Sequence, residues 1–154
     1  GESPSVVLAK NSGQLTLNTP GFSNFPLVAG NATYISQQSY EVVSTGKIKV
    51  KEDGVFLMSA SLAVVNLPSG YVKYAIGIRV NAQQINIMNQ GFTNSPEVTW
   101  WGTNGSFIMN LSENDVVDFI YELSEYRMQQ SGVGPASARN LSLTSLNTGI
   151  TKIQ

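Results

Sequence analysis

The stretch from Val72 to Asn81 reads VKYAIGIRVN, and its apolar and polar residues alternate with a period of two. One set of alternate positions holds Val, Tyr, Ile, Ile and Val, and the other holds Lys, Ala, Gly, Arg and Asn. Successive side chains of a β-strand point to opposite faces of a sheet, so this pattern predicts a strand with one buried face. The stretch therefore favours a fold built from strands.

The same alternation recurs along the rest of the chain, in the segments 47–51, 106–111, 116–123 and 141–144. The segment from Val55 to Val65 is apolar at both sets of positions, and we expect it to be a central strand buried on both faces. Turn-forming pairs such as Asp53-Gly54 and Asn104-Gly105 separate the segments. Short strands at this spacing predict an all-β sandwich or barrel, because no segment sustains a helical period over three turns.

The composition excludes several classes of protein. A length of 154 residues suits a single domain, here 1–154, and the net charge is -1 with only 12% of residues charged. No basic face is available for a nucleic-acid partner, and no apolar run approaches the ~18 residues of a membrane span. The chain has no Cys and no His, which excludes thiol catalysis, serine–histidine triads and the common zinc sites.

Four stretches follow one another in a characteristic order, namely YEVVSTGKI (40–48), DGVFLMSA (53–60), AIGIRVN (75–81) and FIMNLSENDVV (107–117). This succession resembles the globular head of complement component one q and, more distantly, tumour necrosis factor, over about Val6 to Ile150. Bacterial and phage relatives are similarly poor in charge and Cys, and we expect this chain to be one of them. It departs from the family pattern at Asn114, where Gly is usual, and in the last strand, Asn140 to Asn147, which lacks an aromatic-Ser-Gly signature.

The resemblance implies a tumour necrosis factor-like jelly-roll β-sandwich of about 8–10 antiparallel strands. It also implies a homotrimer whose subunits pack apolar sheet faces around a threefold axis. The segment from Val55 to Val65 agrees with this, since a two-layer sandwich covers only one face of a strand. A loop folded over the second face is the alternative. We further expect a stalk or shaft to precede Gly1 in a longer protein.

Trp100 and Trp101 are adjacent, so their rings point to opposite faces of a strand. We expect one ring to fill the core and the other to face solvent or a partner. Tryptophan anchors ligands and stacks on sugar rings, which makes the pair a candidate binding site. Burial of the outer ring between subunits is the alternative.

Uncharged polar residues near an aromatic residue suit the hydroxyl groups of a saccharide, because amides both donate and accept hydrogen bonds. The residues of this kind before the tryptophan pair are Asn89, Gln90, Phe92 and Asn94. Tyr126 and Arg127 open a long Gly-rich loop that extends to about Arg139 and is a second candidate for recognition. A polar loop without a ligand is the alternative at both places.

Three carboxylates close in sequence, Glu113, Asp115 and Asp118, are candidate ligands for calcium. The spacing of an EF-hand is absent, and a solvated hairpin turn is the favoured alternative. Asp118 and Glu122 share one face of a strand, as a glycosidase pair would, but no cleft signal accompanies them. We therefore expect no catalytic function.

These features together predict a non-enzymatic, trimeric adhesive or receptor-binding head that recognises a surface saccharide. Its expected place is extracellular, on a phage tail or fibre tip or on a bacterial spore or surface filament. One alternative is a purely structural head that trimerises and caps a fibre without a ligand of its own. The other is a secreted signalling ligand like the vertebrate family members.

Overall fold

The computed structural model describes residues 3–126 and 136–154. These residues form twelve strands and one short 3₁₀ helix. The elements are β1 (Ser5–Lys10), β2 (Gln14–Leu17), β3 (Ser23–Asn24), η1 (Ala29–Asn31), β4 (Ala32–Ile35), β5 (Tyr40–Ser44), β6 (Lys47–Val50), β7 (Gly54–Leu67), β8 (Gly70–Val80), β9 (Ile85–Ser95), β10 (Thr99–Leu111), β11 (Val116–Glu125) and β12 (Arg139–Lys152).

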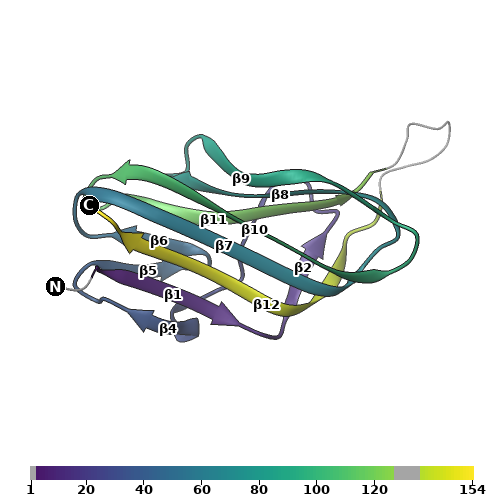
Figure 1. Cartoon of the computed structure of the whole chain (residues 1–154), viewed down its shortest axis with the longest axis horizontal. Helices are drawn as coiled ribbons and strands as arrows, with labels where there is room; N and C mark the ends of the chain where they lie inside the picture. Colours follow the sequence, from purple (N-terminus) through teal and green to yellow (C-terminus); the bar gives the residue numbers. More distant parts are fainter. Residues whose placement is uncertain (1–2, 127–135) are drawn as a thin grey trace.

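Two six-stranded sheets pack face to face in a jelly-roll β-sandwich (Figure 1). The first has the order β10-β7-β12-β1-β4, with β2 paired to β12, and the second has the order β5-β6-β11-β8-β9, with β3 paired to β11. All pairings between these strands are antiparallel. The predicted all-β sandwich is confirmed. The number of strands exceeds the expected 8–10 because β2, β3 and β4 are too short to show an alternating pattern and because strand β9 occupies most of the segment considered as a polar loop.

The hydrophobic core fills the space between the two sheets, where one side chain in two from each strand points inward. In β8 the inward set contains Val72, Ile76 and Ile78, which are almost completely buried. The aromatic rings of Tyr40 and Phe56 meet edge-to-face, with their centroids 6.2 Å apart, and connect the two sheets. Burial of this apolar surface is the main source of the fold's stability.

Strand β7 lies in the middle of its sheet, between β10 and β12, as its apolar sequence predicts. Only one of its faces is buried, with Phe56, Met58 and Leu62 in the core. The expectation of burial on both faces is wrong for the single chain: Leu57 and Ala63 point outward and remain only partly covered. No described segment of the chain packs over this outer face, because both sheets use their inner faces for the core.

The two ends of the sandwich differ in what they contain. Strand β1 begins and β12 ends at one end, and β8 begins and β11 ends at the opposite end (Figure 1). Among the described residues there is no helix that is both long enough and apolar enough to cross a membrane. Strand β11 extends to Glu125, and residues 127–135 of the long loop expected after Tyr126 lie outside the described residues.

Candidate binding surfaces

The outer face of the β10-β7-β12-β1-β4 sheet carries no charged side chain on its first four strands, from the edge strand β10 to β1. The strand register places together on this face Val55, Leu57, Ser59, Ser61, Ala63 and Val65 of β7, Gly102, Asn104, Ser106, Ile108 and Asn110 of β10, Ser145, Asn147, Gly149 and Thr151 of β12, and Ser5, Val7 and Ala9 of β1. We call this surface the uncharged face. Small and neutral side chains of this kind are typical of a surface that another protein covers, because charged residues are depleted at the centre of interfaces.

The outer face of the second sheet is different, because it carries charges that pair with one another. Lys49 lies 3.6 Å from Glu41, and Arg79 lies 3.8 Å from Asp118, measured between nitrogen and oxygen atoms. A third pair joins Lys73 to a glutamate on β11 at 3.2 Å. The Lys49 and Lys73 pairs are partly exposed and typical of a surface that faces water, whereas Asp118 is itself buried. The two outer faces of the sandwich are therefore chemically distinct.

Trp100 and Trp101 point to opposite faces of β10, as strand alternation requires. The ring of Trp101 packs against the core and against Tyr74, with 4.9 Å between ring centroids. Trp100 is 81% exposed. It stands beside a shallow pocket of about 400 Å³ that opens next to the uncharged face, and the backbone and side chains of Ala63 and Val65 line the pocket with it.

Three exposed aromatic side chains meet on the outer surface of the second sheet, at the end away from the termini. Tyr126 contacts Tyr71 and Phe92 with its ring edge-to-face to each, at centroid distances of 6.4 Å and 5.7 Å. We call Tyr71, Phe92 and Tyr126 the aromatic patch. The sequence pointed to Phe92 and Tyr126 separately and missed Tyr71. The signal for Tyr71 was its position next to inward-facing Val72, which turns its ring outward.

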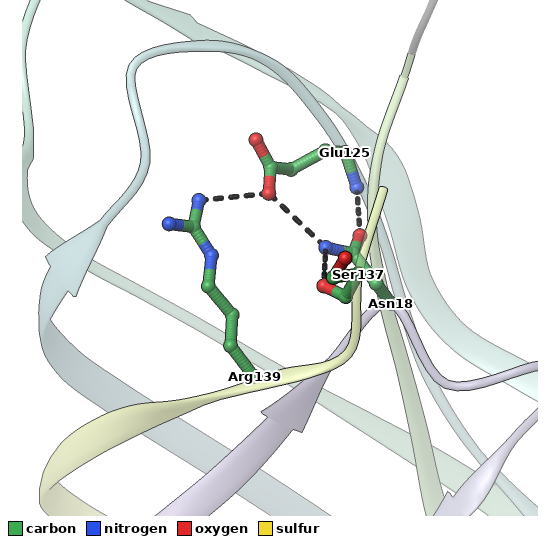
Figure 2. A network of polar contacts seen from close by, with 4 residues as sticks. All are labelled: Asn18, Glu125, Ser137 and Arg139. Atoms are coloured by element: carbon green, nitrogen blue, oxygen red, sulfur yellow. Dashed lines mark hydrogen bonds and ion pairs between the residues drawn. The ribbon is translucent and has the colours of Figure 1, made fainter. Parts of the chain in front are cut away.

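A network of polar contacts holds the end of β11 beside the aromatic patch (Figure 2). The side-chain amide of Asn18 donates to the Glu125 carboxylate and to the Ser137 carbonyl, both at 3.0 Å, and its oxygen accepts from the Glu125 backbone N–H at 2.7 Å. Arg139 donates to the same carboxylate at 2.7 Å. The network thus ties β11 to the start of β12 and fixes the residue that precedes Tyr126.

The remaining candidates for saccharide contact lie in different surroundings. Gln90 and Asn94 are exposed and, with Phe92, point outward from β9. The side chain of Asn89 is turned toward β10 instead, where its amide donates to Thr103 Oγ1 at 2.9 Å. Arg127 lies outside the described residues.

The three candidate calcium ligands do not come together. Among residues 3–126 and 136–154 no group of three or more His, Cys, Asp or Glu side chains is placed to hold a metal ion. Asp118 is buried and pairs with Arg79, whereas Glu113 is exposed in the turn between β10 and β11. Asp115 accepts hydrogen bonds from the Ser112 N–H at 2.8 Å and from an asparagine amide at 2.9 Å. These contacts give Asp115 and Asp118 structural roles.

The same turn explains the departure from the family pattern at Asn114. Its φ angle is 75°, in the left-handed region that glycine favours and that asparagine tolerates better than other residues with a side chain. The Asn114 N–H donates to the Val50 carbonyl at 2.8 Å. Asparagine therefore meets the same backbone requirement as the glycine that is usual at this position.

Comparison with known proteins gives a likeness in fold and none in sequence. No family model matches the chain, and no curated protein matches it. Among solved structures, murine APRIL covers 99% of the chain and is itself covered completely, with a TM-score of 0.64 and 8% identity.

Two further structures extend the comparison. The match to PRD1 vertex protein P5 covers 100% of this chain and 99% of the P5 chain, with a TM-score of 0.62 and 13% sequence identity. The match to the globular domain of zebrafish complement 1qA protein covers 99% of this chain and 98% of that domain, with a TM-score of 0.55 and 12% sequence identity. The chain therefore has a jelly-roll fold similar to that of murine APRIL, the complement 1qA globular domain and PRD1 vertex protein P5.

Proposed function

We propose that this chain is a non-catalytic head domain that assembles as a homotrimer and recognises a saccharide or receptor on a surface. The uncharged face carries the proposal. It is a continuous surface across four strands, its residues are uncharged and mostly small or apolar with three asparagines, and the described chain leaves it uncovered. The threefold arrangement is the one that the resemblance implies, with one subunit's uncharged face against its neighbours.

Contact between copies of the chain suits the chemistry of this face. A second copy brings the same neutral, short side chains, so no charge loses its hydration when the faces meet. The serines, threonines and asparagines of the face can exchange hydrogen bonds with water for hydrogen bonds across the contact. Within one subunit Ser5 and Thr151 already share such a bond, with 3.1 Å between their hydroxyl oxygens.

A recognition function fits the rest of the molecule better than catalysis does. The carboxylates considered as a glycosidase pair are each matched by a base, Asp118 by Arg79 and Glu122 by Lys73. Three identical heads on one particle raise the avidity of weak sites by roughly 10²–10⁴ without new contacts. We place the head extracellularly, on a virion, a phage fibre or a bacterial or spore surface.

A purely structural head is the second candidate, and the position of Trp100 favours it. The exposed ring stands beside the pocket next to the uncharged face, so association of subunits can cover it. In that case the most exposed tryptophan is an interface residue and not a ligand anchor. The trimer would then cap a fibre without a ligand of its own.

Absolute mass by light scattering behind a sizing column tests the trimer, with the sample diluted stepwise to nanomolar subunit. A mass near three times 16.6 kDa that survives dilution supports the proposal. A monomer over the whole range contradicts it. Quenching of Trp100 fluorescence by acrylamide, measured on a Trp101→Phe variant, then distinguishes a covered ring from an exposed one.

A further inference from the structure

The aromatic patch leaves apolar ring surface free for a ligand. Tyr71, Phe92 and Tyr126 are 53%, 57% and 54% exposed, although each ring contacts at least one of the others. Removal of such apolar surface from water lowers the free energy. Three rings gathered at one place offer a ligand more apolar area than isolated side chains do. Their edge-to-face arrangement also keeps the rings from covering one another.

The backbone holds the three rings in position. Tyr71 and Phe92 lie on the directly paired strands β8 and β9, and the Tyr126 N–H donates to the Tyr71 carbonyl at 2.9 Å. Glu125, which precedes Tyr126, is tied to Asn18 by two hydrogen bonds (Figure 2). A ligand that meets preorganised side chains loses less free energy to ordering them.

Neutral amides surround the rings. Gln90 and Asn94 flank Phe92 on the outward face of β9, and Asn94 lies directly opposite Tyr71 in the strand register. Each amide offers donors and an acceptor without net charge. Their side chains therefore provide hydrogen bonds at the edge of an apolar surface.

The charges next to the patch are paired with each other. Lys73, opposite Phe92 in the register, pairs with Glu122 at 3.2 Å, and Arg139 pairs with Glu125 at 2.7 Å. Within the part of the chain that the structure describes, these two bases are therefore each engaged with an acid.

We propose that the aromatic patch binds a neutral saccharide. A sugar ring has an apolar C–H face that packs on an aromatic ring and hydroxyls that pair with neutral amides, which matches the rings and the flanking Gln90 and Asn94. The patch lies on the second sheet, β5-β6-β11-β8-β9, and not on the uncharged face. Saccharide binding and the association of subunits therefore use separate surfaces. The inference rests on the proposed function for its avidity, since each subunit of the trimer supplies one site.

An array of immobilised oligosaccharides, probed with the full chain, tests the inference. The neutral probes are chitotetraose, cellotetraose and maltotetraose, and the acidic probes are polygalacturonate fragments and heparin. We expect binding to at least one neutral probe. We also expect affinity to change by less than about twofold between low and high salt, because a neutral saccharide carries no charge for salt to screen.

Variants locate the site. Tyr71→Ala and Phe92→Ala should each weaken binding about tenfold, whereas Tyr71→Phe, which keeps the ring, should bind as the parent chain does. Val43→Ala is the matched control, because Val43 is an exposed apolar residue on β5, at the other edge of the same sheet. The mass of every variant is measured by light scattering on the same samples.

The outcomes separate the two proposals. A trimer that binds no neutral probe, binds only acidic probes, or binds equally after Tyr71→Ala and Phe92→Ala overturns the saccharide site and leaves the trimer standing. Loss of binding to a cell-surface protein in these variants, without any saccharide binding, overturns it as well. A monomer whose saccharide binding depends on Tyr71 and Phe92 upholds the site and contradicts the trimer.

Discussion

The ring of Trp101 on β10 lies 4.9 Å from the ring of Tyr74 on β8, measured between centroids, and this contact joins the two sheets of the sandwich. The neighbouring Trp100 points to the opposite face and is 81% exposed. Two adjacent residues of the same type therefore have different roles. Trp101 stabilises the fold of one subunit, whereas Trp100 is available to a partner.

Trp101→Ala should lower the free energy of unfolding by about 2–4 kcal/mol, because it removes a large side chain from the packed interior and leaves a cavity. Trp100→Ala is the matched variant and should change the stability of the subunit by less than about 0.5 kcal/mol. Urea unfolding followed by far-ultraviolet circular dichroism, at one subunit concentration, measures both. An equal loss of stability in the two variants would contradict the separate roles.

A lysine placed at Ser61 should dissociate the trimer. Ser61 lies in the middle of the uncharged face, between Asn104 and Asn147 in the strand register. Association would bury an unpaired ammonium group there, at a cost of several kcal/mol per subunit. Light scattering should give a mass near 16.6 kDa for Ser61→Lys.

Ser44→Lys is the control for that variant, because Ser44 is exposed on β5 of the other sheet and the change in charge is the same. It should keep the mass of the parent chain. The proposal would be wrong if Ser61→Lys also kept that mass at micromolar subunit.

Replacement of Asn18 should loosen the end of β11. The residue has a φ of 68°, and its side chain makes the hydrogen bonds that hold Glu125 and Ser137. Asn18→Gly removes the side chain without backbone strain and should cost about 1–3 kcal/mol. Asn18→Ala should cost about 1 kcal/mol more, because alanine is strained in the left-handed region.

Hydrogen exchange of the Glu125 amide gives a local reading of the same change. This N–H donates to Asn18 Oδ1, so it should exchange faster in both variants. Asn140→Ala, at an exposed position on β12, should leave the exchange rate unaltered. Unchanged protection of Glu125 after Asn18→Gly would show that the backbone alone holds this strand end.

Stability should fall at alkaline pH because of Tyr40. Burial raises the pKa of its hydroxyl above the usual value near 10, and the hydroxyl donates to the Pro4 carbonyl at 2.8 Å. Above about pH 10 the unfolded chain releases the proton and the folded chain keeps it. The stabilisation is therefore complete below that pH and is lost as the pH rises, by up to about 1.4 kcal/mol per unit.

Urea midpoints measured between neutral pH and pH 11 test this, with Tyr40→Phe as the comparison. The variant should lose about 1 kcal/mol at neutral pH, where the hydrogen bond is missing, and should show a shallower alkaline decline. An alkaline decline as steep as that of the parent chain would assign the effect to other groups.

The two tryptophans show how far local reasoning extends toward the site. Adjacent residues on a strand must point to opposite faces, so the sequence predicts one inner and one outer ring without any knowledge of the fold. Which ring is outer depends on the register of β10 against β7, and pairing between distant segments sets that register. The same limit applies to Asn89, whose side chain forms a hydrogen bond from β9 to Thr103 on β10 and does not point to the outer surface.

The sequence by itself determined several of the longer strands, the alternation of their side chains between two faces and the scarcity of charge, because side-chain alternation and composition are local properties of the chain. Only the tertiary structure decided which outward residues share a surface. Tyr71, Phe92 and Tyr126 lie far apart in sequence and meet because β8 pairs with both β9 and β11. The uncharged face likewise arises from pairing between β1, β7, β10 and β12, and long-range contacts of this kind leave no periodic signal in any one segment.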